Sequence, residues 1–107
     1  MTADVTEPAV QALIDAINTG DRDAFFAVLT PDATMSDDGR DRDLHQWVDQ
    51  ELFSGQGRME VDSATDGGRS LFATNTNAAY GAMHTFWRFT LQDGKISLFE
   101  TGQAGAG

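Results

Sequence analysis

The chain has 107 residues, of which 40% are apolar, with seven Phe and two Trp, so it can bury a core as one domain without metal or disulfide support. Seven basic residues against seventeen acidic ones give a formal net charge of −10, which argues against nucleic acid or an anionic membrane as partner. The absence of cysteine excludes disulfides, thiol catalysis and thiolate metal sites.

The beginning of the chain, MTADVTEPAVQ, has neither a basic nor an apolar segment, so it does not resemble a secretion signal. The longest apolar run, Ala24 to Leu29, is far too short to span a membrane. We therefore expect a soluble cytoplasmic protein.

Helical periodicity dominates the first half of the chain. A first helix is expected between Thr6, a suitable N-cap, and Gly20, a suitable stop. Its apolar residues recur at helical spacing: Val10, Leu13, Ile14 and Ile17. A short second helix follows Asp21 as N-cap and packs inward through Ala24, Phe25, Val28 and Leu29. An acidic loop then leads to a third helix over about residues 43–53, with Asp43 as N-cap.

The second half of the chain alternates in the manner of strands. Strands are expected over residues 58–65, 70–76, 83–91 and 96–101, with turns at Asp66-Gly67-Gly68 and Asp93-Gly94. Residues 102–107 are expected to form a flexible tail. Helices followed by an antiparallel meander predict a single α+β domain whose helices cover one face of a curved sheet.

The negative charge is confined to one half of the chain. Residues 1–62 hold fourteen acidic and four basic residues, whereas residues 63–107 hold three of each. Outward-facing strand residues are expected to be mostly Ser, Thr, Asn and small apolar groups. Because two neutral faces can meet without repulsion, we predict a homodimer through the sheet. The alternative is a solvated sheet face rich in Thr and Asn.

Four strings, in order, carry a resemblance to a known superfamily: INTGDRDAF, VLTPDATMSDDG, HQWVDQELF and FWRFTLQDGKISLFE. Together they resemble the nuclear transport factor 2-like superfamily, specifically its SnoaL-like and ketosteroid isomerase-like small domains, over about residues 8–101. The resemblance implies a cone-shaped, bent antiparallel sheet wrapped around about three helices, with a pocket inside. Family members include ketosteroid isomerases, polyketide cyclases, dehydratases, epoxide hydrolases and proteins that catalyse nothing, so the fold leaves function open.

The resemblance also offers a catalytic base. In ketosteroid isomerase-like members, the base is the Asp that ends a D-A-T-x-x-D string, and this position is Asp37 here. The structural alternative is a turn residue at Asp37-Asp38-Gly39. The isomerase's hydrogen-bond donors are missing, because the family's Tyr falls on Leu13 and its second acid on Thr85 or Phe86. The Arg-x-Asp of the epoxide hydrolases is also absent, since Arg88 is followed by Phe and Thr. Steroid isomerase activity is not expected.

A second candidate is His84, which alternates with Phe86 and Arg88 on one face of its strand. If that face lines the cone, His84 and Arg88 join Asp37 in a polar cluster suited to a cyclase or dehydratase with an enolisable ligand. If the opposite face lines it, with Met83, Thr85, Trp87 and Phe89, then His84 lies on the outer surface or at a dimer seam. The pattern leaves both orientations open.

The candidate ligand-binding residues are Trp47, Tyr80, Phe86 and Arg88. Tyr80 lies in a loop, where it either closes over the pocket or stays half-exposed. His45 and Asp49 have a spacing that can bind metal, but two ligands are too few, so neither a metal nor a cofactor is predicted. The acidic stretch from Asp37 to Asp43 lacks the Gly and Glu placement of an EF-hand calcium loop.

Three functions remain open at this point. The first is a domain that binds a small, mostly apolar molecule in a small pocket. The second is an isomerase, cyclase or dehydratase with Asp37 as general base, and the third is a non-catalytic dimeric interaction module. The three differ in what the cone contains: an apolar cavity, converging polar groups, or packed side chains.

Overall fold

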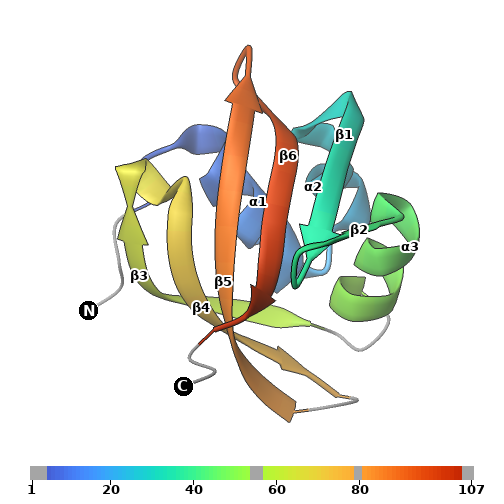
Figure 1. Ribbon diagram of the computed structural model, residues 1–107, viewed down its shortest axis with the longest axis vertical. Helices are drawn as coiled ribbons and strands as arrows, with labels where there is room; N and C mark the ends of the chain where they lie inside the picture. The colour runs from blue at the N-terminus through green and yellow to red at the C-terminus, as the bar shows by residue number, and fades with distance from the viewer. Residues whose placement is uncertain (1–4, 54–56, 79–80, 105–107) are drawn as a thin grey trace.

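The computed structural model describes residues 5–53, 57–78 and 81–104. Its helices are α1 (Pro8–Thr19), α2 (Arg22–Ala27) and α3 (Leu44–Val48), and a π-helical turn, η1 (Asp49–Phe53), follows α3. Its strands are β1 (Leu29–Asp37), β2 (Arg40–Arg42), β3 (Arg58–Thr65), β4 (Ser70–Asn77), β5 (Gly81–Gln92) and β6 (Lys95–Gln103), with a 3-10 turn, η2 (Asp66–Gly68), between β3 and β4 (Figure 1).

All six strands form one sheet in the order β2-β1-β6-β5-β4-β3. Neighbouring strands are antiparallel except β1 and β6, which run parallel and place Met35 beside Phe99 and Asp37 beside Thr101. The predicted α+β class is confirmed, but the prediction of a wholly antiparallel sheet is wrong. The error arises because residues 29–37, which the sequence analysis divided between a helix and a loop, form a strand beside β6.

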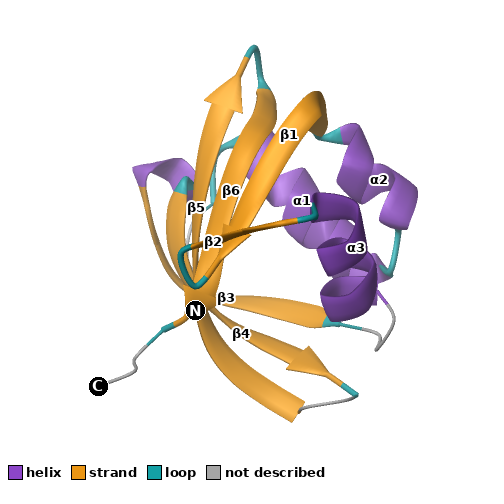
Figure 2. Cartoon of the chain, turned by 45° about the vertical axis from the view of Figure 1, so that its right-hand side comes forward, coloured by secondary structure: helices purple, strands orange, loops and turns teal. Residues whose placement is uncertain are grey.

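The three helices cover one face of the sheet and leave the other face without helical cover (Figure 2). Successive residues of a strand point to opposite faces. On β5, the inner, helix-facing residues are Thr85, Trp87 and Phe89, all buried, whereas His84 and Arg88 are exposed on the outer face. The core therefore lies between the helices and the inner face.

Helix α1 buries the predicted apolar stripe of Val10, Leu13, Ile14 and Ile17. It ends at Gly20, whose φ of 71° suits the left-handed conformation that glycine adopts readily. The N-terminal prediction is off by one residue: the N-cap is Glu7, which makes no side-chain capping hydrogen bond. Pro8 begins the helix, where its missing N–H costs nothing.

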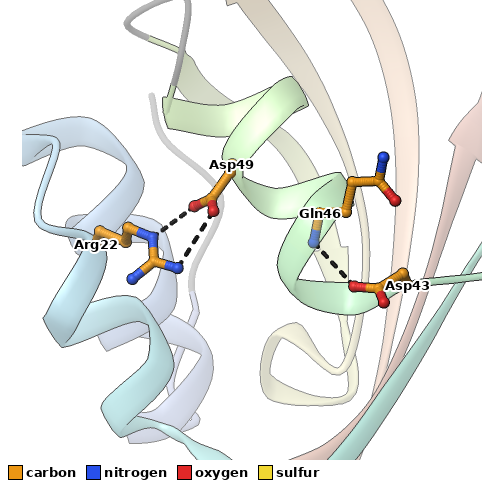
Figure 3. A network of polar contacts seen from close by, with 4 residues as sticks. All are labelled: Arg22, Asp43, Gln46 and Asp49. Carbon is orange, nitrogen blue, oxygen red and sulfur yellow. Dashed lines mark hydrogen bonds and ion pairs between the residues drawn. The ribbon is translucent and has the colours of Figure 1, made fainter.

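The two shorter helices are capped as predicted and joined by polar contacts (Figure 3). Asp21 accepts a hydrogen bond from the backbone N–H of Ala24, and Asp43 accepts one from Gln46, each at 3.0 Å. Arg22 of α2 forms an exposed ion pair with Asp49, which follows α3. The hydrogen bond from Arg22 lowers the pKa of the Asp49 carboxyl below its ordinary value.

The ring of Phe26 completes the contact between α2 and α3. The Arg22 guanidinium lies 4.7 Å from its centroid, and the His45 imidazole stacks on it with a centroid distance of 4.7 Å. His45 and Asp49 thus each contact α2. Within the described residues, no group of three or more His, Cys, Asp or Glu is placed to hold a metal ion.

The strands of the second half lie close to their predicted positions. The turn at Asp66–Gly68 joins β3 to β4, and β5 is longer at both ends than the predicted strand over 83–91. Strand β6 continues to Gln103, two residues into the segment expected to be a flexible tail. No described helix is both long enough and apolar enough to cross a membrane.

Candidate functional site

A cavity of about 260 Å³ lies at one end of the sheet, between its inner face and the segment formed by α3 and η1. The C-terminal ends of β1, β4 and β6 and the N-terminal end of β5 form part of its wall. The lining residues are Asp37, Asp38, Trp47, Glu51, Leu52, Asn75, Met83, Thr85, Trp87, Thr101, Gly102 and Gln103. Both tryptophans of the chain are among them.

Asp37 is the last residue of β1 and is partly buried at the cavity wall. The indole N–H of Trp47 donates a hydrogen bond to its Oδ2 at 3.0 Å, and the guanidinium of Arg42 lies 3.9 Å from the same oxygen. No described residue donates a hydrogen bond to Oδ1. Oδ2 is therefore held in place by Trp47, and Oδ1 makes no hydrogen bond within the described residues.

The turn after Asp37 is held against β6. Asp38, with a φ of 52°, donates its backbone N–H to the Thr101 carbonyl at 2.9 Å, and its Oδ1 accepts the Gln103 N–H at 2.9 Å. This close approach requires a glycine at position 102, because a Cβ there would lie 2.5 Å from Asp38 Oδ1. The turn is thus fixed beside the cavity, and it fixes the position of Asp37.

On the sheet side of the cavity, three residues of the inner face form a buried polar network. The Trp87 indole N–H lies 3.0 Å from Thr85 Oγ1 and 3.3 Å from Asn75 Oδ1, and the Thr85 hydroxyl donates toward the same Asn75 oxygen. Asn75 is only 4% exposed. Asn75 is not among the predicted site residues, because asparagine in a strand is expected to face outward. Its signal was its place at two-residue spacing after Leu71 and Ala73, which are buried on the same face.

The structure separates His84, Phe86 and Arg88 from this cavity. His84 Nδ1 lies 3.2 Å from the Thr74 hydroxyl, and the Arg88 guanidinium lies 5.5 Å from the Phe86 ring centroid, all on the outer face. Of the two orientations left open for β5, the one with Thr85 and Trp87 lining the cone is the one found. Asp37, His84 and Arg88 therefore do not form a common cluster.

The other sequence candidates divide between the cavity and elsewhere. Trp47 lines the cavity beside Asp37, as a ligand-binding residue would. Tyr80 lies outside the described residues. Leu13, at the position of the family's Tyr, is fully buried in the core and offers no donor, whereas Thr85 lines the cavity.

No family model and no curated protein matches the chain by sequence. Solved structures do match it. A nuclear transport factor 2-like protein of unknown function from Cytophaga hutchinsonii is 17% identical, with 94% of this chain and 90% of that chain covered at a TM-score of 0.73. The chain has the nuclear transport factor 2-like fold.

Two further structures share this fold. A candidate polyketide cyclase from Sinorhizobium meliloti is 24% identical, with 88% of this chain and 93% of that chain covered at a TM-score of 0.71. A candidate ketosteroid isomerase from Kribbella flavida is 14% identical, with 95% and 79% covered at a TM-score of 0.73. At these identities the likeness establishes the nuclear transport factor 2-like fold and not an activity.

Proposed function

We propose that this protein binds a small, mostly apolar molecule in the cavity between the sheet and α3. The observation that supports this function is the cavity itself, because the large side chains in its wall, Trp47 and Trp87, leave it unfilled. The apolar side chains of Trp47, Leu52, Met83 and Trp87 contribute to its wall. Ligand pockets in proteins commonly measure about 300–1,000 Å³. A cavity of about 260 Å³ therefore suits a ligand of one or two rings.

The chain provides its own reporters for a binding test. It contains two tryptophans, both in the cavity wall, so an amide correlation NMR spectrum contains two indole N–H signals, both from the site. We expect naphthalene, a neutral bicyclic hydrocarbon, to shift both indole signals saturably. If neither signal moves up to the solubility limit of naphthalene, the proposal is wrong.

A matched pair of variants separates binding in the cavity from binding elsewhere. Met83 lines the cavity, and its neighbour Ala82 lies on the outer face of the same strand. Met83→Phe should reduce the available volume and weaken naphthalene binding, because the added ring occupies the site. Ala82→Phe adds the same ring outside and should leave naphthalene affinity unchanged.

A second candidate function, an isomerase, cyclase or dehydratase reaction, is favoured by the position of Asp37. Its Oδ1 is not engaged by any described residue, while Oδ2 is held by Trp47. Such a carboxylate can take a proton from a carbon next to a carbonyl group and return it. A candidate polyketide cyclase and a candidate ketosteroid isomerase are among the proteins that share the fold. His84 is remote from the cavity and takes no part in this mechanism.

Hydrogen–deuterium exchange at carbon tests for such a base without knowledge of the substrate. We expect the protein to accelerate deuterium uptake from D₂O at the carbon next to the carbonyl of 2-tetralone. Asp37→Asn should lower that catalysed rate by roughly 10²–10⁴-fold, since this is the usual contribution of a general base. Asp41→Asn, an exposed acid on β2, is the control and should have no effect. Exchange at the buffer rate would exclude the base.

A third function, self-association, is favoured by the outer face of the sheet. Phe72 is the one exposed large hydrophobic side chain among the described residues, at 53% exposure, and it lies beside Phe86 on the neighbouring strand. No described helix covers this face, and the half of the chain that supplies most of it has no net charge. We propose that a second copy of the chain covers it.

Light scattering at micromolar concentration tests this pairing. The wild type should have the mass of a dimer, and Phe72→Asp should convert it to a monomer, because two carboxylates would face each other across the contact. Thr90→Asp, also on the outer strand face but away from Phe72, is a control for added charge. A monomeric wild type would contradict the proposal.

A further inference from the structure

The cavity contains one polar group whose orientation is fixed and whose hydrogen-bonding capacity is only partly used. Asn75 is buried, and its Oδ1 lies within hydrogen-bond distance of Trp87 Nε1 and Thr85 Oγ1. An indole N–H can only donate. The atom that faces Trp87 must therefore be the amide oxygen, and this assigns the other end of the amide as the nitrogen.

No described residue accepts a hydrogen bond from the amide nitrogen, Nδ2. Among the described residues, every fully buried side-chain nitrogen or oxygen has a hydrogen-bond partner. Because Nδ2 has none, it is not fully buried and is accessible to solvent or to a ligand. Asn75 is only 4% exposed and lines the cavity. We therefore infer that the accessible surface of Nδ2 lies in the cavity.

The charges around the cavity are of one sign. Its wall includes three carboxylates, Asp37, Asp38 and Glu51, and no Lys, Arg or His among the described residues. Arg42 approaches Asp37 but is not part of the wall. An anionic ligand would bring its charge beside these carboxylates and lose its hydration without a compensating cation, which is unfavourable.

The Asn75 donor and the negative charges of the wall restrict the chemistry of the ligand more than the volume of the cavity does. We propose that Asn75 is the specificity-determining donor of the cavity, and that its Nδ2 binds an oxygen acceptor on an uncharged ligand. Ketones, lactones and similar neutral carbonyl compounds meet this requirement, whereas carboxylates do not. This inference rests on the proposed ligand-binding function and adds the polarity and charge of the ligand to it.

Three bicyclic probes of nearly the same shape test the inference. Naphthalene has no acceptor, 1-acetonaphthone carries a neutral carbonyl oxygen, and 1-naphthoate replaces the methyl ketone by a carboxylate with the same number of heavy atoms. Affinities are measured from the two indole N–H signals. We expect 1-acetonaphthone to bind more tightly than naphthalene, and 1-naphthoate to bind at least about tenfold more weakly than 1-acetonaphthone.

Asn75→Leu isolates the contribution of the amide. The variant keeps the shape approximately, and the Trp87 indole keeps Thr85 Oγ1 as its acceptor at 3.0 Å. It should lower the affinity for 1-acetonaphthone by about 3- to 10-fold, the usual effect of one lost neutral hydrogen bond, and it should not lower the affinity for naphthalene, which has no acceptor. Thr74→Val, next to Asn75 but on the outer face, is the control and should change neither affinity.

A measurement on the wild type covers the case in which Asn75→Leu does not fold. The side-chain NH₂ signals of Asn75, assigned in the wild type, should shift with 1-acetonaphthone far more than with naphthalene. The inference is overturned if those signals ignore the ketone, if Asn75→Leu binds the ketone as tightly as the wild type, or if naphthoate binds as well as the ketone. In each of these cases naphthalene still binds, whereas failure of naphthalene itself would overturn the proposed function.

Discussion

The two faces of the sheet have the same backbone and very different chemistry. On β6, Phe99 is fully buried against the helices, while its neighbour Leu98 is partly exposed on the outer face. On β5, the inner face has Trp87 and Thr85 in a hydrogen-bonded network, while the outer face has His84 beside Thr74. Within the described residues, the buried inner-face side chains of Asn75, Thr85 and Thr101 all make hydrogen bonds, and all three residues line the cavity.

The largest difference between the faces should be in stability. Phe99→Ala removes a fully buried ring and should lower the free energy of unfolding by about 3–5 kcal/mol. Leu98→Ala, one residue away on the outer face, should cost less, because part of its side chain already contacts water. Urea denaturation of both variants measures the two values. Equal losses would mean that the outer face is packed as tightly as the inner one.

A smaller effect is expected where the turn after β1 meets β6. Gly102→Ala would place a Cβ 2.5 Å from Asp38 Oδ1 and 2.9 Å from Phe86 Cε1, so the turn or the ring has to move. We expect a loss of about 1–3 kcal/mol in the free energy of unfolding, the usual cost of overpacking. The same variant should shift the Trp47 indole signal, because Asp37 precedes the displaced turn. An unchanged signal would show that Asp37 is positioned independently of the turn.

The smallest effect is expected at the exposed ion pair between Arg22 and Asp49. Because the folded-state pKa of Asp49 is lowered, this group stabilises the fold above its unfolded value, near 3.8, and the contribution is lost as pH falls through the folded value. Asp49→Asn should therefore be slightly less stable than the wild type at pH 7. The two stabilities should converge in acid, as thermal unfolding at a series of pH values would show. A constant difference at all pH values would contradict this assignment.

Local signals predicted the parts of the molecule whose contacts are local. The buried stripe of α1, the caps Asp21 and Asp43, and the turn at Asp66–Gly68 each depend on residues a few positions apart. Strand β1 was missed because it contains Pro31 and Asp32, which are uncommon in strands, and because its parallel partner lies more than sixty residues later in the sequence.

Part of the candidate site could also be predicted from local sequence signals. Asp37 and Trp47 were identified by motif and composition, and both lie at the cavity. The orientation of β5 was not predictable, because each of its faces combines aromatic and polar residues, and packing against the helices decides between them. Asn75 was not predicted because asparagine in a strand was expected to face outward, and the indole N–H that faces its oxygen belongs to Trp87 on the neighbouring strand.

The parallel pairing of β1 with β6 has a consequence for how the chain folds. Strand β6 lies between β1 and β5, so the strand nearest the end of the described chain is in the middle of the sheet and not at its edge. A chain shortened before Lys95 would keep β1–β2 and β3–β5 as two separate ribbons with no hydrogen bonds between them. During synthesis, the sheet that covers the apolar faces of α1 and α2 becomes continuous only after β6 has been made.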